Sequence, residues 1–198
     1  MTIEAQVRFL MQGTEYGDAG LAAAMERELR QRLEEAGRAG RRLRVYCGFD
    51  PRTTDLHIGH TVPIRKLRQF QELGHHVTFV VGTFTSMIGD PSDQDRLRAA
   101  LTLEQAEANG RTYAEQAFRI LDAKRTEVRF NHEWLAGLKS AEMVRMASQF
   151  SLQQILAREA FRRRWEAGDA VWLHETFYSL MQAQDASVLE ADVQVGGS

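Results

Sequence analysis

The sequence predicts an α/β fold built on a parallel sheet, because strand-like and helix-like segments alternate along it. Val45–Cys47 is strand-like, residues 56–73 carry apolar side chains at helical spacing, and residues 76–81 are apolar almost throughout. A strand, a helix and a strand in this order form a βαβ unit with a right-handed crossover. Gly, Asp and Pro residues follow both strands, so we expect a ligand site at the carboxyl edge of the sheet.

The composition is that of a globular domain rather than a membrane or nucleic-acid-coating protein. The 198 residues, 43% of them hydrophobic and 26% charged, can bury one sizeable core. The net charge of −2 leaves RNA only local basic patches, such as residues 41–42 or 162–164. One cysteine permits no internal disulfide, no apolar run could span a membrane, and residues 1–4 do not begin a signal peptide. We therefore expect a cytoplasmic protein with no membrane partner.

An amphipathic piece and one helix are expected before the first strand. Residues 5–11 form a short amphipathic piece, and residues 21–36, rich in Ala, Leu, Glu and Arg, form a helix ended by Gly37. We assign residues 1–40 to an N-terminal helical segment and residues 41–198 to one α/β domain.

The first strand leads into the most informative stretch of the chain. Gly48, Asp50 and Pro51 should break the strand, and Asp55 should cap a helix that begins at Leu56.

That helix would display His57 and His60 on one face, since they lie three residues apart. Gly59 between them leaves room for a flat ligand against the backbone. A helix N-terminus also favours a phosphate at this position.

Further elements follow to the end of the chain. Thr102 and Gln105 form a capping box that opens a helix over 102–121. We expect a third strand at 127–130, helices across 140–182, and a fourth strand beginning at Asp192.

These motifs resemble those of a known enzyme family. His57–His60 reads His-Ile-Gly-His and resembles the HIGH signature of class I aminoacyl-tRNA synthetases. The preceding Tyr46–Pro51, at a fixed gap, makes the resemblance closest to the tyrosyl-tRNA synthetases and disfavours the plain alternative of two surface histidines after a turn. The resemblance implies a Rossmann-like parallel sheet of the HUP-type class I fold, incomplete at its C-terminus, with a helical connective insertion at about 140–185.

The resemblance also implies a tyrosine pocket. Tyr178, Gln182 and Asp185 fall at i, i+4 and i+7, on one helical face. By this match Tyr178 and Gln182 contact the amino end of the substrate, and Asp185 accepts a hydrogen bond from its phenol, with Tyr46 assisting. A buried acceptor left unpaired costs about 1–3 kcal/mol, so this pair would penalise phenylalanine. The alternative is an ordinary polar helix face.

Two further loops carry residues of the same implied pocket. Gly89–Ser92 matches the Gly-Asp-Pro-Ser element of the family, in which Asp90 would hold the α-ammonium of the amino acid; the alternative is an Asp-Pro turn. Asn131 belongs to an Asn-x-x-Trp element and would lie near the amino acid, with Trp134 in the core. Asn131 could equally cap a helix, and both roles can hold.

The nucleotide side of the site is implied by the same motifs. His57 and His60 would stabilise charge on the α- to γ-phosphates of ATP, and Mg²⁺ would accompany ATP without a protein metal cage. The residues that would bind ATP are Cys47, Gly48, Asp50, Arg52, Gly59 and Arg98.

The chain departs from the family pattern at three positions. Arg52 replaces the usual Thr, Asp93 replaces Gly, and Gln184 stands where an aromatic residue is common. The lysine-bearing KMSKS segment and the anticodon-binding domains are not in this sequence, so the resemblance covers about half of a full enzyme.

Two functions of different classes follow. The first is a fragment of the catalytic domain of a tyrosine–tRNA ligase, which binds L-tyrosine and ATP and, in the full-length enzyme, forms tyrosyl-adenylate and charges tRNA(Tyr). The second is a synthetase-like domain that binds tyrosine or adenylate without charging tRNA. A tryptophan-specific relative is disfavoured, because Asp185 and Tyr46 suit a phenol.

The resemblance also implies a homodimer formed through the connective helices. Trp172, Leu173 and Phe177 are the candidates for that contact; with equal weight, they could be internal core.

Overall fold

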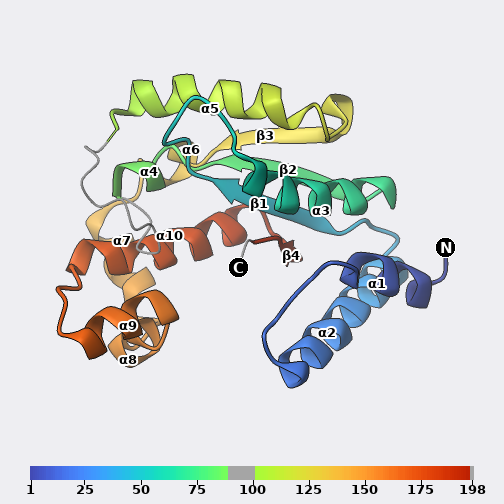
Figure 1. Ribbon diagram of the computed structural model, residues 1–198, viewed down its shortest axis with the longest axis horizontal. Helices are drawn as coiled ribbons and strands as arrows, with labels where there is room; N and C mark the ends of the chain where they lie inside the picture. The colour runs from blue at the N-terminus through green and yellow to red at the C-terminus, as the bar shows by residue number, and fades with distance from the viewer. Residues whose placement is uncertain (89–100, 197–198) are drawn as a thin grey trace.

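Within the residues that the computed structural model describes, 1–88 and 101–196, four strands form one sheet (Figure 1). The strand order is β3-β2-β1-β4, and every pairing is parallel. The strands are β1 (Arg44–Phe49), β2 (His76–Val81), β3 (Thr126–Phe130) and β4 (Val193–Gln194). The predicted fold class, a Rossmann-like α/β sheet, is confirmed.

Helices join successive strands and cover the sheet. Those that connect the strands are α3 (Thr61–Glu72) after β1, α5 (Leu103–Ala117) after β2, and α10 (Leu173–Val188) before β4. In Figure 1, α5 lies above the sheet and α10 below it. The predicted apolar stripe of α3 is buried in the sheet core through Ile64, Leu67 and Phe70. Each such side chain contributes about 1.5–3 kcal/mol by leaving water.

The N-terminal segment is a pair of helices, α1 (Ile3–Met11) and α2 (Ala19–Arg38), as expected. The Asp18 side chain caps α2. This helix runs one residue past Gly37, its predicted end, and the chain turns at Gly40, whose φ of +63° favours glycine.

The first strand is longer than predicted. Gly48 continues the ladder opposite Val80 instead of breaking it, and β1 ends at Phe49. The prediction was wrong because parallel pairing to β2 satisfies the backbone of Gly48, so its lack of a side chain does not end the strand.

The helix that follows begins later than predicted. Residues 58–60 form a 3₁₀ turn, η1 (Ile58–His60), and α3 starts at Thr61. The cap is His57 rather than Asp55: the His57 Nδ1 accepts from the Gly59 N–H at 3.1 Å, and the His60 Nδ1 accepts from the His57 N–H at 3.2 Å. The histidines therefore build their own turn.

Later elements agree with the sequence in kind but not always in length. The predicted capping box of Thr102 and Gln105 is present, but α5 ends at Ala117, and residues 118–121 form turns instead of helix. The remaining elements are α4 (Thr85–Ile88), η2 (Ala123–Arg125), α6 (His132–Leu135), α7 (Ser140–Ala147), α8 (Leu152–Leu156) and α9 (Glu159–Ala167).

The connective region has a hydrophobic cluster of its own. Met146, Ile155, Phe161 and Leu180 are buried together, apart from the main core around the sheet. Beside them Arg164 forms a buried ion pair with Glu175, at 2.6 Å. Arg164 therefore does not belong to the basic surface patch that the sequence suggested. No helix among the described residues combines the length and the apolar character that crossing a membrane requires.

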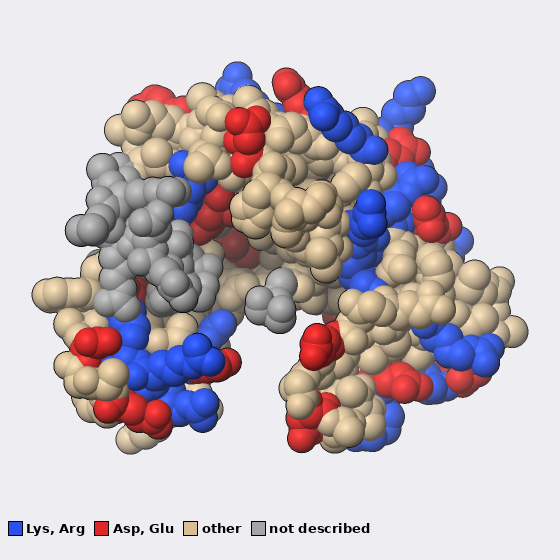
Figure 2. Space-filling model, viewed as in Figure 1, with Lys and Arg blue, Asp and Glu red and all other residues tan. Residues whose placement is uncertain are grey.

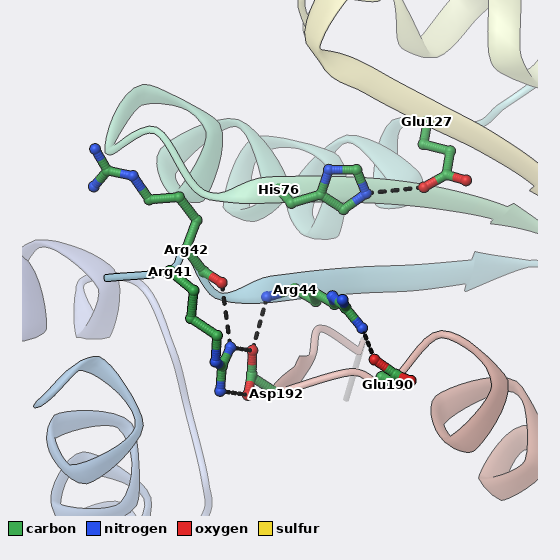
Figure 3. A network of polar contacts seen from close by, with 7 residues as sticks. All are labelled: Arg41, Arg42, Arg44, His76, Glu127, Glu190 and Asp192. Atoms are coloured by element: carbon green, nitrogen blue, oxygen red, sulfur yellow. Dashed lines mark hydrogen bonds and ion pairs between the residues drawn. The ribbon is translucent and has the colours of Figure 1, made fainter. Parts of the chain in front are cut away.

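A set of polar contacts, here called the polar staple and formed by the Arg41 side chain, the Asp192 carboxylate and the Arg44 backbone, fixes β4 against β1 (Figure 3). The Arg41 guanidinium donates two hydrogen bonds to the Asp192 carboxylate, at 2.6 and 2.8 Å, and the Arg44 backbone N–H donates a third at 2.9 Å. Burial alone would raise the pKa of Asp192, but Arg41 and the Arg44 amide together lower it. The carboxylate is therefore charged at neutral pH, and this staple is complete there.

We expect Asp192→Ala to lower the free energy of unfolding by about 1.5–3 kcal/mol, because three hydrogen bonds to a charged group are lost. Urea unfolding at pH 7 measures the change. The control is Glu190→Ala, which removes the neighbouring exposed ion pair with Arg44 (Figure 3) and should cost less than about 1 kcal/mol. Equal losses in the two variants would show that Asp192 is not a staple.

Candidate active site

The loops that follow β1, β2 and β3 meet α10 at the carboxyl edge of the sheet. Asp50 follows β1, Thr85 follows β2 and Asn131 follows β3. These side chains are joined by hydrogen bonds to one another and to residues of α10. The structure therefore brings polar groups together where the sequence predicted a site.

Asp50 is held from two sides. Its Oδ1 accepts a hydrogen bond from the Thr85 hydroxyl at 2.7 Å, and its Oδ2 accepts one from the Tyr178 hydroxyl at 3.0 Å. The backbone of Gly82 lies so close that a Cβ there would fall 1.9 Å from Asp50 Oδ1. Only glycine at position 82 allows the carboxylate to take this place.

Asp185 is the buried carboxylate of the site, with 5% of its surface exposed. Its Oδ1 accepts from the Trp134 indole N–H at 2.8 Å, and its Oδ2 accepts from the Asn131 amide at 3.3 Å. Burial raises the pKa of Asp185 to about 6, although both hydrogen bonds favour the charged form. At neutral pH the buried carboxylate is therefore mostly ionised and can accept a further hydrogen bond.

Tyr46 stands beside this carboxylate. Its hydroxyl donates to the Gln182 backbone carbonyl at 3.3 Å, which links β1 to α10. Burial raises the pKa of Tyr46, and the negative charge of Asp185 raises it further. Tyr46 and Asp185 therefore lie within electrostatic reach of each other, and the phenol of Tyr46 stays protonated. Tyr178, Gln182 and Asp185 project from one face of α10, as their spacing predicted.

His57 and His60 lie with their rings stacked, 3.7 Å between centroids. Burial lowers the pKa of His60 to about 4, and the neighbouring His57 lowers it further. His60 is thus neutral at pH 7, and because its Nδ1 accepts a hydrogen bond from the His57 N–H, its proton resides on Nε2. A neutral Nε2–H can donate to a phosphate oxygen without carrying a charge of its own.

The two glycines of the expected nucleotide site differ in their surroundings. At Gly48 a Cβ would meet nothing within 4 Å, so β1 borders open space near its carboxyl end. At Gly59 a Cβ would lie 2.9 Å from the His57 ring, so glycine makes room for the stacked histidines. Cys47 is buried in the sheet core, where burial raises the pKa of its thiol to about 12. Its expected part in binding ATP stays a prediction.

Some expected site residues cannot be placed. Asp90 and Arg98 lie outside the described residues, together with Asp93 and the whole Gly89–Ser92 element. Arg52 is half-buried in the loop after β1.

Among the described residues, no group of three or more His, Cys, Asp or Glu gathers into a metal-binding cluster.

Sequence reasoning missed two contributors to the site. Thr85 hydrogen-bonds to Asp50, and Trp134, which was expected in the core, is only partly buried and donates to Asp185. The signal for Thr85 was its place in Gly82–Ser86, directly after a buried strand, where open parallel sheets gather ligand-binding groups. Asn131 has no side-chain capping hydrogen bond in α6; its amide points instead to Thr85 and Asp185.

Comparison with known proteins agrees with this geometry. Residues 38–198 match the family described as tRNA synthetases class I (W and Y). The chain belongs to this family. The expected resemblance is therefore confirmed, and the family covers both the tyrosine and the tryptophan enzymes.

The curated relatives are tyrosine–tRNA ligases. The one from Symbiobacterium thermophilum is 41% identical over 198 residues, which are 100% of this chain and 47% of that protein. The one from Desulfotalea psychrophila is 47% identical over 171 residues, 86% of this chain and 42% of that protein. The chain thus spans about half the length of the curated relatives that it matches.

Solved structures share the fold. The C-terminally truncated mitochondrial tyrosyl-tRNA synthetase of Aspergillus nidulans superposes with a TM-score of 0.71 at 26% identity, over 99% of this chain and 62% of that one. The tyrosyl-tRNA synthetase of Archaeoglobus fulgidus, solved with L-tyrosine, gives a TM-score of 0.72 at 22% identity, over 99% of this chain and 55% of that one. The second likeness is one of fold alone.

We expect the Asp185 carboxyl to titrate near pH 6 instead of near 3.8, because it is buried. Asn131→Ala should raise this midpoint, since one hydrogen bond to the charged form is lost. Carbon-13 NMR of the aspartate side chains over pH 3–8 measures both values, and Asp185→Asn assigns the signal. A midpoint near 4 in the unmodified chain would contradict the described burial.

Proposed function

We propose that this chain is the amino-acid-activating part of a tyrosine–tRNA ligase, binding L-tyrosine and ATP. In a full-length enzyme it would form tyrosyl-adenylate and pass tyrosine to tRNA(Tyr). The observation that carries the proposal is the buried, ionisable Asp185 facing Tyr46 at the carboxyl edge of the sheet. A phenol can donate to this carboxylate, while phenylalanine would leave it without that partner, at a cost of about 1–3 kcal/mol. The same pair favours tyrosine over tryptophan within the family.

The remaining amino-acid contacts extend along α10. Tyr178 and Gln182 lie on the same helix face as Asp185 and would contact the amino end of tyrosine, with Asn131 supporting the pocket from behind Asp185. Asp90 would hold the α-ammonium group, as the family motif implies.

The proposed chemistry needs positioning and charge stabilisation, not a covalent enzyme intermediate. An oxygen of the tyrosine carboxylate attacks the α-phosphorus of ATP, the bond to the β-phosphate bridging oxygen breaks, and pyrophosphate leaves with that electron pair. A ribose hydroxyl of tRNA then attacks the tyrosyl carbonyl carbon and gives up its proton to the phosphate or to solvent. The bond from that carbon to the phosphate oxygen breaks, and AMP leaves with the electron pair. His60, neutral with its proton on Nε2, would donate to phosphate oxygens as charge develops, and His57 would act beside it.

The nucleotide would lie over β1 and the turn that follows it. Gly48 borders open space, and Gly59 keeps the histidine turn compact. Asp50 shapes the loop after β1; the contributions of Cys47, Arg52 and Arg98 rest on the family motif alone. Mg²⁺ would arrive bound to the phosphates of ATP. A tyrosine–tRNA ligase acts where proteins are made, and the location proposed for this chain is the cytoplasm.

We expect Asp185→Ala to lose the preference for tyrosine over phenylalanine, by about 10- to 100-fold, because a hydrogen bond to a charged group is removed. His60→Ala should spare tyrosine binding but reduce adenylate formation, since His60 would contact the phosphates of ATP and not the amino acid. Calorimetry with both amino acids and tyrosine-dependent ATP–pyrophosphate exchange on this chain measure the two effects.

The matched control is Asp169→Ala, an exposed aspartate between α9 and α10, which should change neither quantity. Equal loss of tyrosine binding in the Asp185 and His60 variants would contradict these roles. Tyrosine binding without any exchange in the unmodified chain would favour the second candidate, a synthetase-like domain that binds tyrosine or adenylate without charging tRNA.

We also propose a homodimer through the connective helices. Trp172 and Leu173 at the start of α10 are 60% and 73% exposed, and Trp165 of α9 is 64% exposed. Phe177, in contrast, packs against the internal cluster of this region. Trp172 and Leu173 therefore remain candidates for the dimer contact.

Leu173→Glu should convert a dimer into a monomer, because a charge would be placed in an apolar contact. Sedimentation velocity measures the change. Leu21→Glu on α2, where the leucine is 47% exposed, is the control and should leave the assembly intact. A monomeric unmodified chain would refute the proposed contact.

A further inference from the structure

One unbroken series of hydrogen bonds joins Asp50 to Asp185. The Thr85 hydroxyl donates to Asp50 Oδ1 at 2.7 Å, and the Asn131 amide nitrogen donates to Thr85 Oγ1 at 3.1 Å. The same amide nitrogen donates to Asp185 Oδ2 at 3.3 Å. Two carboxylates from different ends of the site are thus connected through two neutral side chains.

The direction of each hydrogen bond in this series is determined. Asn131 Oδ1 accepts from the Phe84 backbone N–H at 2.8 Å, so the amide cannot flip without losing that bond. Its two N–H hydrogens therefore point to Thr85 and to Asp185. The single hydroxyl proton of Thr85 then points to Asp50. Each carboxylate receives a donor from the series and is held as an acceptor.

The series is also shielded from water. Thr85 is 3% exposed, Asn131 1% and Asp185 5%. Buried polar groups of this kind hold one arrangement strongly, because an unpaired member would be costly in a low dielectric. Thr85 is the junction: it is the residue through which Asn131 and Asp50 are connected.

We propose that Thr85 is a positioning residue of the amino-acid site, which orients Asn131 so that Asp185 is presented as an acceptor for the phenol of the ligand. The inference rests on the proposed function for the identity of that ligand. It adds that the loop after β2, and not only α10 and β1, determines the preference for tyrosine over phenylalanine.

The preference for tyrosine should depend on pH through the ionisation of Asp185. Asp185 accepts a phenol best when ionised, so the preference for tyrosine should be complete above its pKa of about 6 and be lost as the pH falls through that value. Without the Thr85 hydroxyl, Asn131 would hold Asp185 less firmly, and the midpoint would move to higher pH. Among the described residues, the titratable groups that face this series include Tyr46 from β1, whose pKa is raised, and Tyr178, whose hydroxyl donates to Asp50. The phenol of Tyr46 remains protonated across this range.

The experiment compares Thr85→Val, which removes the hydroxyl at nearly constant shape, with Thr85→Ser, which keeps it. The control is Thr83→Val: Thr83 is a buried threonine of the same loop whose hydroxyl contacts His132 Nδ1 at 2.8 Å instead of this series. The first readout is the pKa of Asp185 by carbon-13 NMR without ligand. The second is the ratio of tyrosine to phenylalanine affinity, by calorimetry from pH 5 to 8.

We expect Thr85→Val to raise the Asp185 midpoint by about half a unit or more and to lower the tyrosine preference at pH 7 by about threefold to tenfold, the effect of one hydrogen bond. Thr85→Ser should restore both values, and Thr83→Val should change neither. An unchanged midpoint in Thr85→Val, or an equal shift in Thr83→Val, would overturn the proposal. If the midpoint shifts as expected but the unmodified chain does not prefer tyrosine, the proposed function fails while the role of Thr85 in orienting the carboxylate stands.

Discussion

The position of β1 between β2 and β4 is the constraint on which the rest of the structure depends. Pairing with β4 at Val45 and Tyr46 and with β2 along its whole length makes β1 a central strand, and the β2 pairing carries it through Gly48 to Phe49. The loop after β1 is thereby brought beside the loop after β2 and beside α10. Asp50 can then meet Thr85 and Tyr178, although the last of these lies 128 residues away in the chain. Without that central pairing, the site residues would have no common edge on which to gather.

Burial of polar groups is the second organising feature of the molecule. Asp185 and Asn131 are among the most deeply buried polar residues, and each is satisfied by hydrogen bonds from a different element. The same rule holds in the connective region, where Arg164 is buried but paired with Glu175. Near the active edge, burial shifts the pKa of Asp185 upward and that of His60 downward. Burial therefore makes Asp185 a hydrogen-bond acceptor on one side of the site and keeps His60 a neutral donor on the other.

The two hydrophobic clusters stabilise different regions of the molecule. The larger one joins the sheet to α1, α2, α3 and α5, while the smaller one holds α7 to α10 together. Helix α10 belongs to both regions, since Leu180 packs in the connective cluster and Asp185 reaches the sheet edge. The amino-acid pocket is consequently built at the junction of the sheet and the connective helices.

The sequence by itself determined the α/β class, the parallel sheet, the capping box of α5 and the face shared by Tyr178, Gln182 and Asp185, because each depends on residues close together in the chain. It failed at Gly48, which stays in its strand through pairing with the distant β2, and at Asp55, whose expected place as the cap is taken by the neighbouring His57. The tertiary structure alone decided that Thr85 and Trp134 serve the site and that Asp185 is buried enough to titrate near 6. Desolvation and hydrogen bonds between separate elements are properties of the packed chain, and no local pattern encodes them.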